Sequence, residues 1–222
     1  MKKIIVCGFV LVLAAAVIFG GCSRKPKYTV PEYQLAAGEE TTSAPGIIIN
    51  KGKREVFMFA VVNGKYFTQP TRHGVVFADG SNGDKSVLIG LGDEKVFYAA
   101  MVAVGFGPSN KLTIDDMSKG VSVEGEPLDV FVAWDGKEVP FANVIRASQE
   151  RPMDIRFGGN LENAKEYNTG CILCLDSCAV GITSNAAYET GASETINFYG
   201  KKDVLPADGT MVRVIFRARA FS

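Results

Sequence analysis

Three cysteines lie within one short segment, Cys-Ile-Leu-Cys-Leu-Asp-Ser-Cys. They are Cys171, Cys174 and Cys178, and Gly170 and Gly181 flank them. Thiolates that share one metal ion lie about 2.3 Å from it, so their sulfurs come within about 4 Å of each other, which a tight Cys-x-x-Cys turn allows. The residue types and their spacing therefore indicate a metal or iron–sulfur centre.

The number of cysteines supports this interpretation. The chain has five cysteines, and two of them, Cys7 and Cys22, fall in or at the end of an N-terminal targeting segment. Of the three that remain, one stays unpaired if the others form a disulfide, whereas one metal centre binds all three. The alternatives are a disulfide between Cys171 and Cys174 with Cys178 buried, or a helix that places the three cysteines on one buried face.

His73 is the only histidine of the chain and the natural candidate for a fourth ligand. A neutral imidazole suits zinc, copper or iron, although a loop position after Pro70-Thr71-Arg72 is also compatible with no role. Asp176, inside the cysteine segment, is a weaker candidate for an oxygen ligand, and its position favours a solvated turn residue. Three ligands from one segment favour an iron–sulfur cluster, for example 4Fe-4S, and zinc or copper are the alternatives.

The first residues indicate export. Lys2-Lys3 precede an apolar run from Ile4 to Phe19, and Gly20-Gly21 lead to Cys22, an order typical of a secretory signal. The last four of these residues resemble a bacterial lipobox, in which Leu is more usual than Phe19. We expect cleavage before Cys22, a lipid on its sulfur, and a domain outside the cytoplasm, anchored to a bacterial membrane in the cell envelope. An uncleaved anchor helix is the alternative, although the run is marginal for the about 20 residues that a membrane span needs.

Composition predicts a single folded domain. Of the 222 residues, 47% are hydrophobic, which is enough for one substantial core. Basic and acidic residues balance at 24 each and no basic stripe occurs, so we expect no nucleic-acid binding. We divide the chain into a signal peptide (1–21), a lipid-attached Cys22 with a flexible linker (22–45), and a folded domain (46–222).

Apolar patterns within the domain predict an α+β fold dominated by β-hairpins, with two or three short helices. Asn63-Gly64 predicts a hairpin turn between strands at 55–62 and 65–68, and Asp135-Gly136 predicts a turn after a strand at 128–134. The clearest helix is 93–104, with acids in its first turn. Further strands are expected at 47–49, 74–78, 86–89, 153–157 and 211–220, and short helices at 141–147 and 161–167, the last with Asn160 as its cap.

At several of these residues the chain resembles the YdjY-like family of exported bacterial lipoproteins, which is described as ferredoxin-like or metal-binding. The resemblance covers most of 46–188, and the cysteine segment is its most specific part. It implies a metal or iron–sulfur centre on Cys171, Cys174 and Cys178, with His73 as a partner. The matching segments are Thr71-Arg72-His73, the strand and turn 130–136, Gly170-Cys171-Ile172-Leu173-Cys174 with Ser177-Cys178, and Ser184-Asn185-Ala186.

Three functions follow from these observations. The first is a lipid-anchored iron–sulfur protein that carries electrons to a membrane redox partner. The second is a zinc or copper protein with ligands Cys171, Cys174, Cys178 and His73. The third is a thiol redox protein working through Cys171 and Cys174, which needs a lowered thiol pKa. We expect a binding or electron-transfer module rather than an enzyme.

Overall fold

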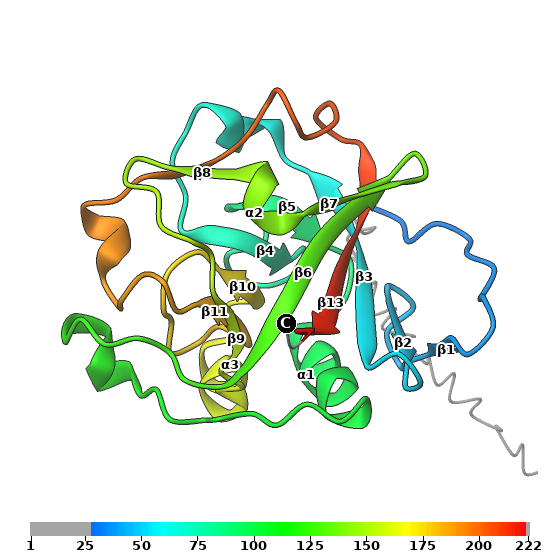
Figure 1. Ribbon diagram of the computed structural model, residues 1–222, viewed down its shortest axis with the longest axis horizontal. Coiled ribbons are helices and arrows are strands. Elements are labelled where there is room, and N and C mark those ends of the chain that lie inside the picture. Colours follow the sequence, from blue (N-terminus) through cyan, green and yellow to red (C-terminus); the bar gives the residue numbers. More distant parts are fainter. Residues whose placement is uncertain (1–27, 221–222) are drawn as a thin grey trace, which may run out of the picture.

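The computed structural model describes residues 28–220, and strands far apart in the sequence close into a barrel (Figure 1). Eight strands form the ring β3-β13-β6-β9-β11-β10-β4-β5, and β5 pairs back onto β3. The signal peptide and Cys22 lie outside the described residues. The strands are β1 (Glu40–Thr41), β2 (Ile47–Asn50), β3 (Glu55–Val62), β4 (His73–Phe77), β5 (Ser86–Gly90), β6 (Glu126–Trp134), β7 (Lys137–Pro140), β8 (Ile145–Ala147), β9 (Ile155–Phe157), β10 (Cys171–Cys174), β11 (Thr183–Asn185), β12 (Phe198–Gly200) and β13 (Met211–Ala218), and the α-helices are α1 (Glu94–Ala103), α2 (Phe141–Val144) and α3 (Leu161–Tyr167).

The expected hairpin-dominated α+β fold is wrong, because the domain is mostly β and its main sheet is closed. Asn63-Gly64 does not join a hairpin: Gly64–Phe67 form a 3-10 helix, and the Gly64 amide donates to Asp208 Oδ1 at 2.7 Å. β3 is buried along its whole length and takes β13 and β5 as neighbours from distant parts of the chain. Long-range burial has overridden a local turn preference here.

The core lies inside the barrel and under α1. Helix α1 confirms the helix expected at 93–104, and Asp93 caps it, with Oδ1 accepting from the amides of Lys95 (2.8 Å) and Val96 (3.2 Å). Its buried face brings Phe97 against Phe216 of β13, with ring centroids 4.7 Å apart. The turn expected at Asp135-Gly136 joins β6 to β7. Among residues 28–220, no helix has both the length and the apolar character that a membrane crossing requires.

Residues 28–45, expected as part of the linker, lie on the outer face of the barrel. Tyr33 packs edge-on against Phe57 and Phe59, with ring centroids 5.4 and 5.5 Å away. Further along, β1 pairs antiparallel with β2. This stretch therefore covers apolar side chains that point outward from β3.

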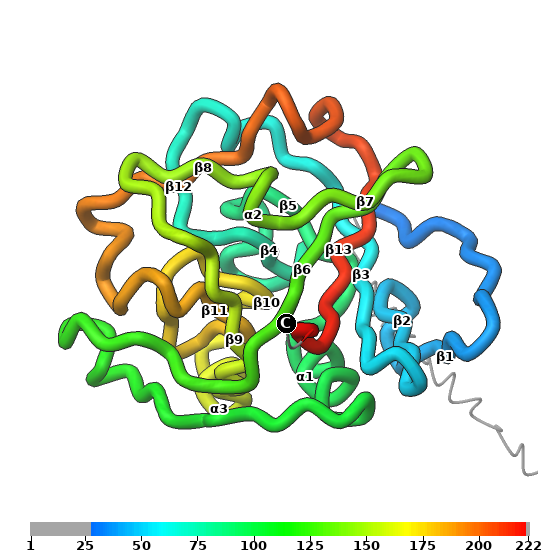
Figure 2. The backbone as a smooth tube through the Cα atoms, in the orientation of Figure 1, coloured from blue at the N-terminus to red at the C-terminus, as the bar shows by residue number. Residues whose placement is uncertain are grey.

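Between α1 and β6 the chain makes a long excursion through residues 104–125, which we call the excursion. In Figure 2 it passes α3 before it returns to β6. A hydrogen bond links the excursion to α3, in which Asn163 Nδ2 donates to the Leu112 carbonyl at 3.3 Å. The excursion places a 3-10 helix, Ile114–Ser118, against the part of the wall that contains β10 and the loop after it.

Candidate metal centre

Two neighbouring strands carry the candidate ligands. β10 runs antiparallel to β4, with Cys171 opposite Val76 and Cys174 opposite His73. Residues three apart on a regular strand face opposite sides of a sheet, but the pairing register shifts twice between these cysteines. The shifts let both sulfurs turn to one side of the wall. The Cys-x-x-Cys segment is thus a bulged strand, and both the expected tight turn and the helical alternative are wrong.

The cysteines face away from the main core. Ile172 and Leu173 belong to the large apolar cluster inside the barrel, whereas Cys171 and Cys174 form a separate buried cluster with Val76 and Cys178. Cys174 ends strand β10, whereas Cys178 lies in the loop that follows this strand. Because their cluster is separate from the core inside the barrel, the thiols lie between the barrel wall and the segments that cover it.

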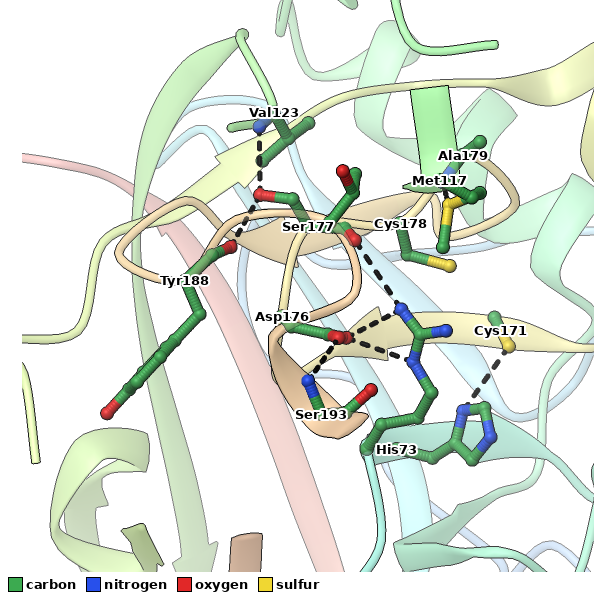
Figure 3. A network of polar contacts seen from close by, with 12 residues as sticks. His73, Met117, Val123, Cys171, Asp176, Ser177, Cys178, Ala179, Tyr188 and Ser193 are labelled. Atoms are coloured by element: carbon green, nitrogen blue, oxygen red, sulfur yellow. Dashed lines mark hydrogen bonds and ion pairs between the residues drawn. The ribbon is translucent and has the colours of Figure 1, made fainter. Parts of the chain in front are cut away.

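The ligand atoms converge. His73 Nδ1, Cys171 Sγ and Cys174 Sγ all lie within 4.8 Å of one another. Figure 3 shows the contact of His73 with Cys171, in which Nδ1 is 3.6 Å from Sγ. Cys171 and Cys174 are fully buried and His73 is half-buried. All three cysteines of the described chain are free thiols. His73, Cys171 and Cys174 form a group that could hold a metal ion.

Cys178 lies beside this group but is not part of it. Cys178 is 3% exposed and packs in the same cluster, where its thiol interacts with that of Cys174. It falls outside the set of atoms that all lie within 4.8 Å of each other. The structure therefore assembles two of the three expected cysteines with the histidine, and holds the third cysteine next to them.

The segment that carries Cys178 joins two neighbouring parallel strands, β10 and β11, and we call residues 175–182 the crossover loop. A buried loop must satisfy its polar groups, and this one does so through both main-chain and side-chain bonds, such as that from the Ser177 amide to the Tyr188 carbonyl at 2.9 Å. Ser177 Oγ accepts from the Val123 amide at 2.9 Å and donates to the Tyr188 carbonyl at 2.7 Å. Asn163 Nδ2 donates to the Ala179 carbonyl at 2.8 Å.

The side chain of Asn160 also supports the crossover loop. Asn160 is the residue before α3, as expected, but it has φ +46° and its side chain makes no capping bond, so the expected side-chain cap is wrong. Its Nδ2 instead donates to the carbonyls of Cys178 (3.1 Å) and Gly181 (3.3 Å). Tertiary hydrogen bonds to the crossover loop have replaced the local one, because that loop buries carbonyls that need donors.

An ion pair fixes the start of the crossover loop. Arg72, next to His73, donates from Nε and Nη2 to Asp176 Oδ1 at 3.0 and 2.7 Å, and the Ser193 amide donates to the other carboxylate oxygen at 3.2 Å (Figure 3). Asp176 is fully buried, so its interpretation as a solvated turn residue is wrong, and it lies outside the convergent ligand group. Burial opposes the charge of Arg72, but negative charge on Cys178, Asp176 and Cys174 raises its pKa.

The three thiols shift one another's pKa values. The hydrogen bond from Cys174, together with His73, lowers the pKa of Cys171 well below its usual range even though burial opposes this. Contacts with Cys171 and Cys178, together with burial, raise the pKa of Cys174. The Cys174 hydrogen bond also lowers the pKa of Cys178, where Arg72 offsets part of the cost of burial. Cys171 and Cys178 thus give up their protons more readily than Cys174 does.

The buried hydroxyl of Ser184 lies beside the candidate ligand Cys174. This residue lies opposite Cys174 in the parallel pairing of β10 with β11, and its buried Oγ has no hydrogen-bond partner within residues 28–220. A Cβ placed on Gly181 would lie 2.9 Å from both Ser184 Oγ and Cys174 Sγ, so these atoms share one small space. A hydroxyl beside a thiolate ligand is a suitable outer contact, since thiolates accept hydrogen bonds. The residues present fit a thiolate-bound ion.

Sequence reasoning missed Arg72, Asn160 and Ser184 as parts of the site. A signal existed for two of them, because Arg72 and Ser184 lie in short segments that carry the family resemblance. Nothing local marks Asn160, whose sequence context is that of a helix start. Its role depends on where the crossover loop lies.

A closed β-barrel with a thiol and imidazole cluster in its wall defines the class of this domain, and comparisons name the family. The YdjY domain matches residues 47–217. The uncharacterized protein YdjY of Escherichia coli (strain K12) is 44% identical over 174 residues, which cover 76% of this chain and 77% of that protein. The chain therefore belongs to the YdjY domain family. No solved structure matches it.

Proposed function

We propose that this YdjY domain holds a single thiophilic metal ion on Cys171, Cys174 and His73, with Cys178 as the additional thiol. The observation that carries the proposal is the convergence of the three ligand atoms within 4.8 Å, although Cys171 and His73 are 98 positions apart in the sequence. Buried thiols and an imidazole are the donors that zinc and copper prefer. Neighbouring strands hold these donors, which is more rigid than a loop.

The spacing supports one ion over an iron–sulfur cluster. Two thiolates on one ion come within about 4 Å of each other, which matches the convergence seen here. In a 4Fe–4S cluster each cysteine binds a different iron, so the cysteine sulfurs lie further apart than on a single ion. The close spacing of the ligand atoms therefore gives less support to electron transfer through an iron–sulfur cluster. The metal analysis below includes iron with sulfide as one outcome.

Charge balance also supports a bound cation. Cys171 and Cys174 carry two negative charges once both bind metal, and buried charges are costly unless they are compensated. The nearby guanidinium of Arg72 is already bound to the fully buried Asp176, so it compensates only part of this charge. A cation at the centre of the three ligands completes the balance.

Thiol exchange receives less support than metal binding. A redox thiol must reach a disulfide on its partner, and Cys171 and Cys174 are both fully buried. The lowered pKa of Cys171 suits a metal ligand equally well, because metals bind the thiolate. A buried thiolate next to an imidazole is better placed to hold an ion than to attack another protein.

The proposal also places the domain in the cell envelope, tethered by a lipid on Cys22. Its support is the N-terminal order of basic residues, apolar run, small residues and Cys22. Membrane fractionation of the full chain and of a Cys22→Ser variant, with mass spectrometry of the mature N-terminus, tests this part. Release of the variant to the soluble envelope fraction is expected, and equal membrane retention of both proteins would contradict the anchor.

Metal analysis and visible absorption of the full chain, purified anaerobically, test the centre. We expect one zinc or copper ion per chain, its loss in Cys171→Ser and Cys174→Ser, and a smaller loss in Cys178→Ser, because that sulfur lies outside the convergent group. Far-UV circular dichroism confirms that each variant folds. No metal in the wild-type protein, or equal metal in all variants, would overturn the proposal, and brown protein with iron and sulfide would replace it with a cluster.

A further inference from the structure

A thioether lies against the thiols. Met117 belongs to the 3-10 helix Ile114–Ser118 of the excursion, and its side chain packs on the buried cluster of Val76 and the three cysteines. Its Sδ accepts a hydrogen bond from the Ala179 amide at 3.3 Å, one residue beyond Cys178 (Figure 3). The sulfur atom therefore points at the crossover loop and is not turned to solvent.

Several hydrogen bonds hold the excursion in this place. The Val123 amide donates to Ser177 Oγ, as described above, and Thr190 Oγ1 donates to the Asp116 carbonyl at 2.7 Å. The Thr190 amide also donates to the Val121 carbonyl at 2.9 Å. These contacts flank Met117 on both sides in the sequence. The thioether is thus positioned relative to the cysteines by the fold, and not only by its own apolar contacts.

The sulfur of methionine changes the expected metal preference. Protein zinc sites use thiolate, imidazole and carboxylate ligands, whereas a set of thiolate and thioether sulfurs is the soft environment that selects copper(I). The carboxylate within the cysteine segment, Asp176, already binds Arg72 and the Ser193 amide. The donors gathered here are therefore sulfur and imidazole nitrogen.

We infer that Met117 Sδ is a ligand of the proposed centre and that the centre takes copper(I) in preference to zinc. The inference rests on the proposed function and specifies its metal. Copper enters already reduced, and the protons that the thiols release on binding pass to solvent, so no electron transfer is required. The excursion then acts as the cover that brings the soft ligand to the ion.

The alternative role of Met117 is to fill space over the cysteines, since methionine commonly fills irregular gaps. Met117→Leu separates the two roles, because leucine has a similar volume and no sulfur. A packing role predicts that copper and zinc affinities change together or not at all. A ligand role predicts that copper(I) affinity falls while zinc affinity stays the same. Met211→Leu is the matched control, since Met211 packs on the outer cluster with β3 side chains.

The experiment is a pair of anaerobic titrations of the full chain, one with copper(I) against a chromophoric copper(I) chelator with ascorbate present, and one with zinc against a zinc chelator. The proteins are wild type, Met117→Leu, Met211→Leu and Cys171→Ser. We expect copper(I) to bind the wild type with a preference over zinc, and Met117→Leu to weaken copper(I) at least ~10-fold without weakening zinc. Met211→Leu should match the wild type for both metals.

The outcomes separate the two proposals. Unchanged copper(I) binding in Met117→Leu, a parallel loss of both metals, or a wild-type preference for zinc would overturn the role of Met117 and leave the metal centre standing. Absence of either metal from the wild type, or binding that Cys171→Ser does not reduce, would overturn the centre itself. X-ray absorption of the copper-loaded wild type and Met117→Leu adds a direct readout, the loss of one sulfur neighbour.

Discussion

The two halves of the barrel are built differently. On one side β3, β13 and β6 pair in unbroken antiparallel register, from Met211 opposite Val61 to Arg217 opposite Glu55 in the pairing of β13 with β3. On the other side β9, β11, β10 and β4 are short, two of the junctions around the ring are parallel, and β10 is bulged. The candidate ligands that strands carry, His73, Cys171 and Cys174, all lie in the irregular half.

The difference shows how this fold separates stability from chemistry. In the regular half, backbone ladders satisfy the polar groups and apolar side chains fill the inside. In the irregular half, side chains such as Asn160, Asn163 and Arg72 satisfy the backbone and charges of a buried loop. Irregular backbone is what turns Cys171 and Cys174 to one side, and its polar support keeps them buried. Four experiments test this separation.

The largest effect is expected in the regular half. Phe216 is fully buried and packs on Phe97, so Phe216→Ala should lower the free energy of unfolding by about 3–5 kcal/mol. Denaturant unfolding measures this loss, and metal titration of the folded protein should show an unchanged affinity. Leu35→Ala, at a side chain that is 41% exposed, is the control with little effect. A large fall in metal affinity in Phe216→Ala would show that the halves are not separable.

A somewhat smaller loss is expected when the buried ion pair of the irregular half is broken. Arg72→Met leaves Asp176 buried without its cation, which should destabilise the protein by about 3 kcal/mol and also weaken metal binding. Lys51→Met is the matched control: its pair with Glu40 has a similar distance, 2.8 Å against 2.7 Å, but is exposed and should contribute less than about 1 kcal/mol. Equal losses in the two variants would contradict a special role for burial. The double change Arg72→Met with Asp176→Leu should recover part of the stability.

Gly181→Ala tests the space around the Cys174 sulfur. The added Cβ would lie 2.9 Å from Cys174 Sγ and from Ser184 Oγ, so the sulfur must move. Overpacking of this kind costs about 1–3 kcal/mol of stability, and we expect metal affinity to fall as well because the ligand is displaced. Gly107→Ala is the control, since a Cβ there meets nothing within 4 Å. Wild-type affinity in Gly181→Ala would show that Cys174 is not a ligand.

The smallest effect is a pH dependence of metal affinity. Burial and its thiol contacts raise the pKa of Cys174, so this thiol keeps its proton near neutral pH and must release it when metal binds. The pKa of Cys171 is lowered, so Cys171 adds no such step there. Affinity should therefore rise with pH by about tenfold per unit, or about 1.4 kcal/mol, between roughly pH 7 and 9. A competition titration at several pH values measures the slope, and a slope near two protons would contradict the lowered pKa of Cys171.

Elements whose signals are local were predicted correctly from the sequence. The strand at 55–62, the helix that Asp93 caps and the turn at Asp135-Gly136 depend on side-chain patterns and hydrogen bonds within a few residues. Two local features were predicted wrongly because distant contacts decide them. The turn at Asn63-Gly64 and the cap at Asn160 both yielded to contacts with segments far along the chain.

The sequence by itself determined which atoms of this protein can bind a soft metal, because thiols and one imidazole are recognisable by type and spacing. Only the tertiary structure decided that Cys171, Cys174 and His73 meet, that Cys178 stands beside them, and that Met117 covers them. The physical reason is that strand pairing, a bulge and the closure of the barrel are set by burial over the whole chain. No local pattern of residues contains that information.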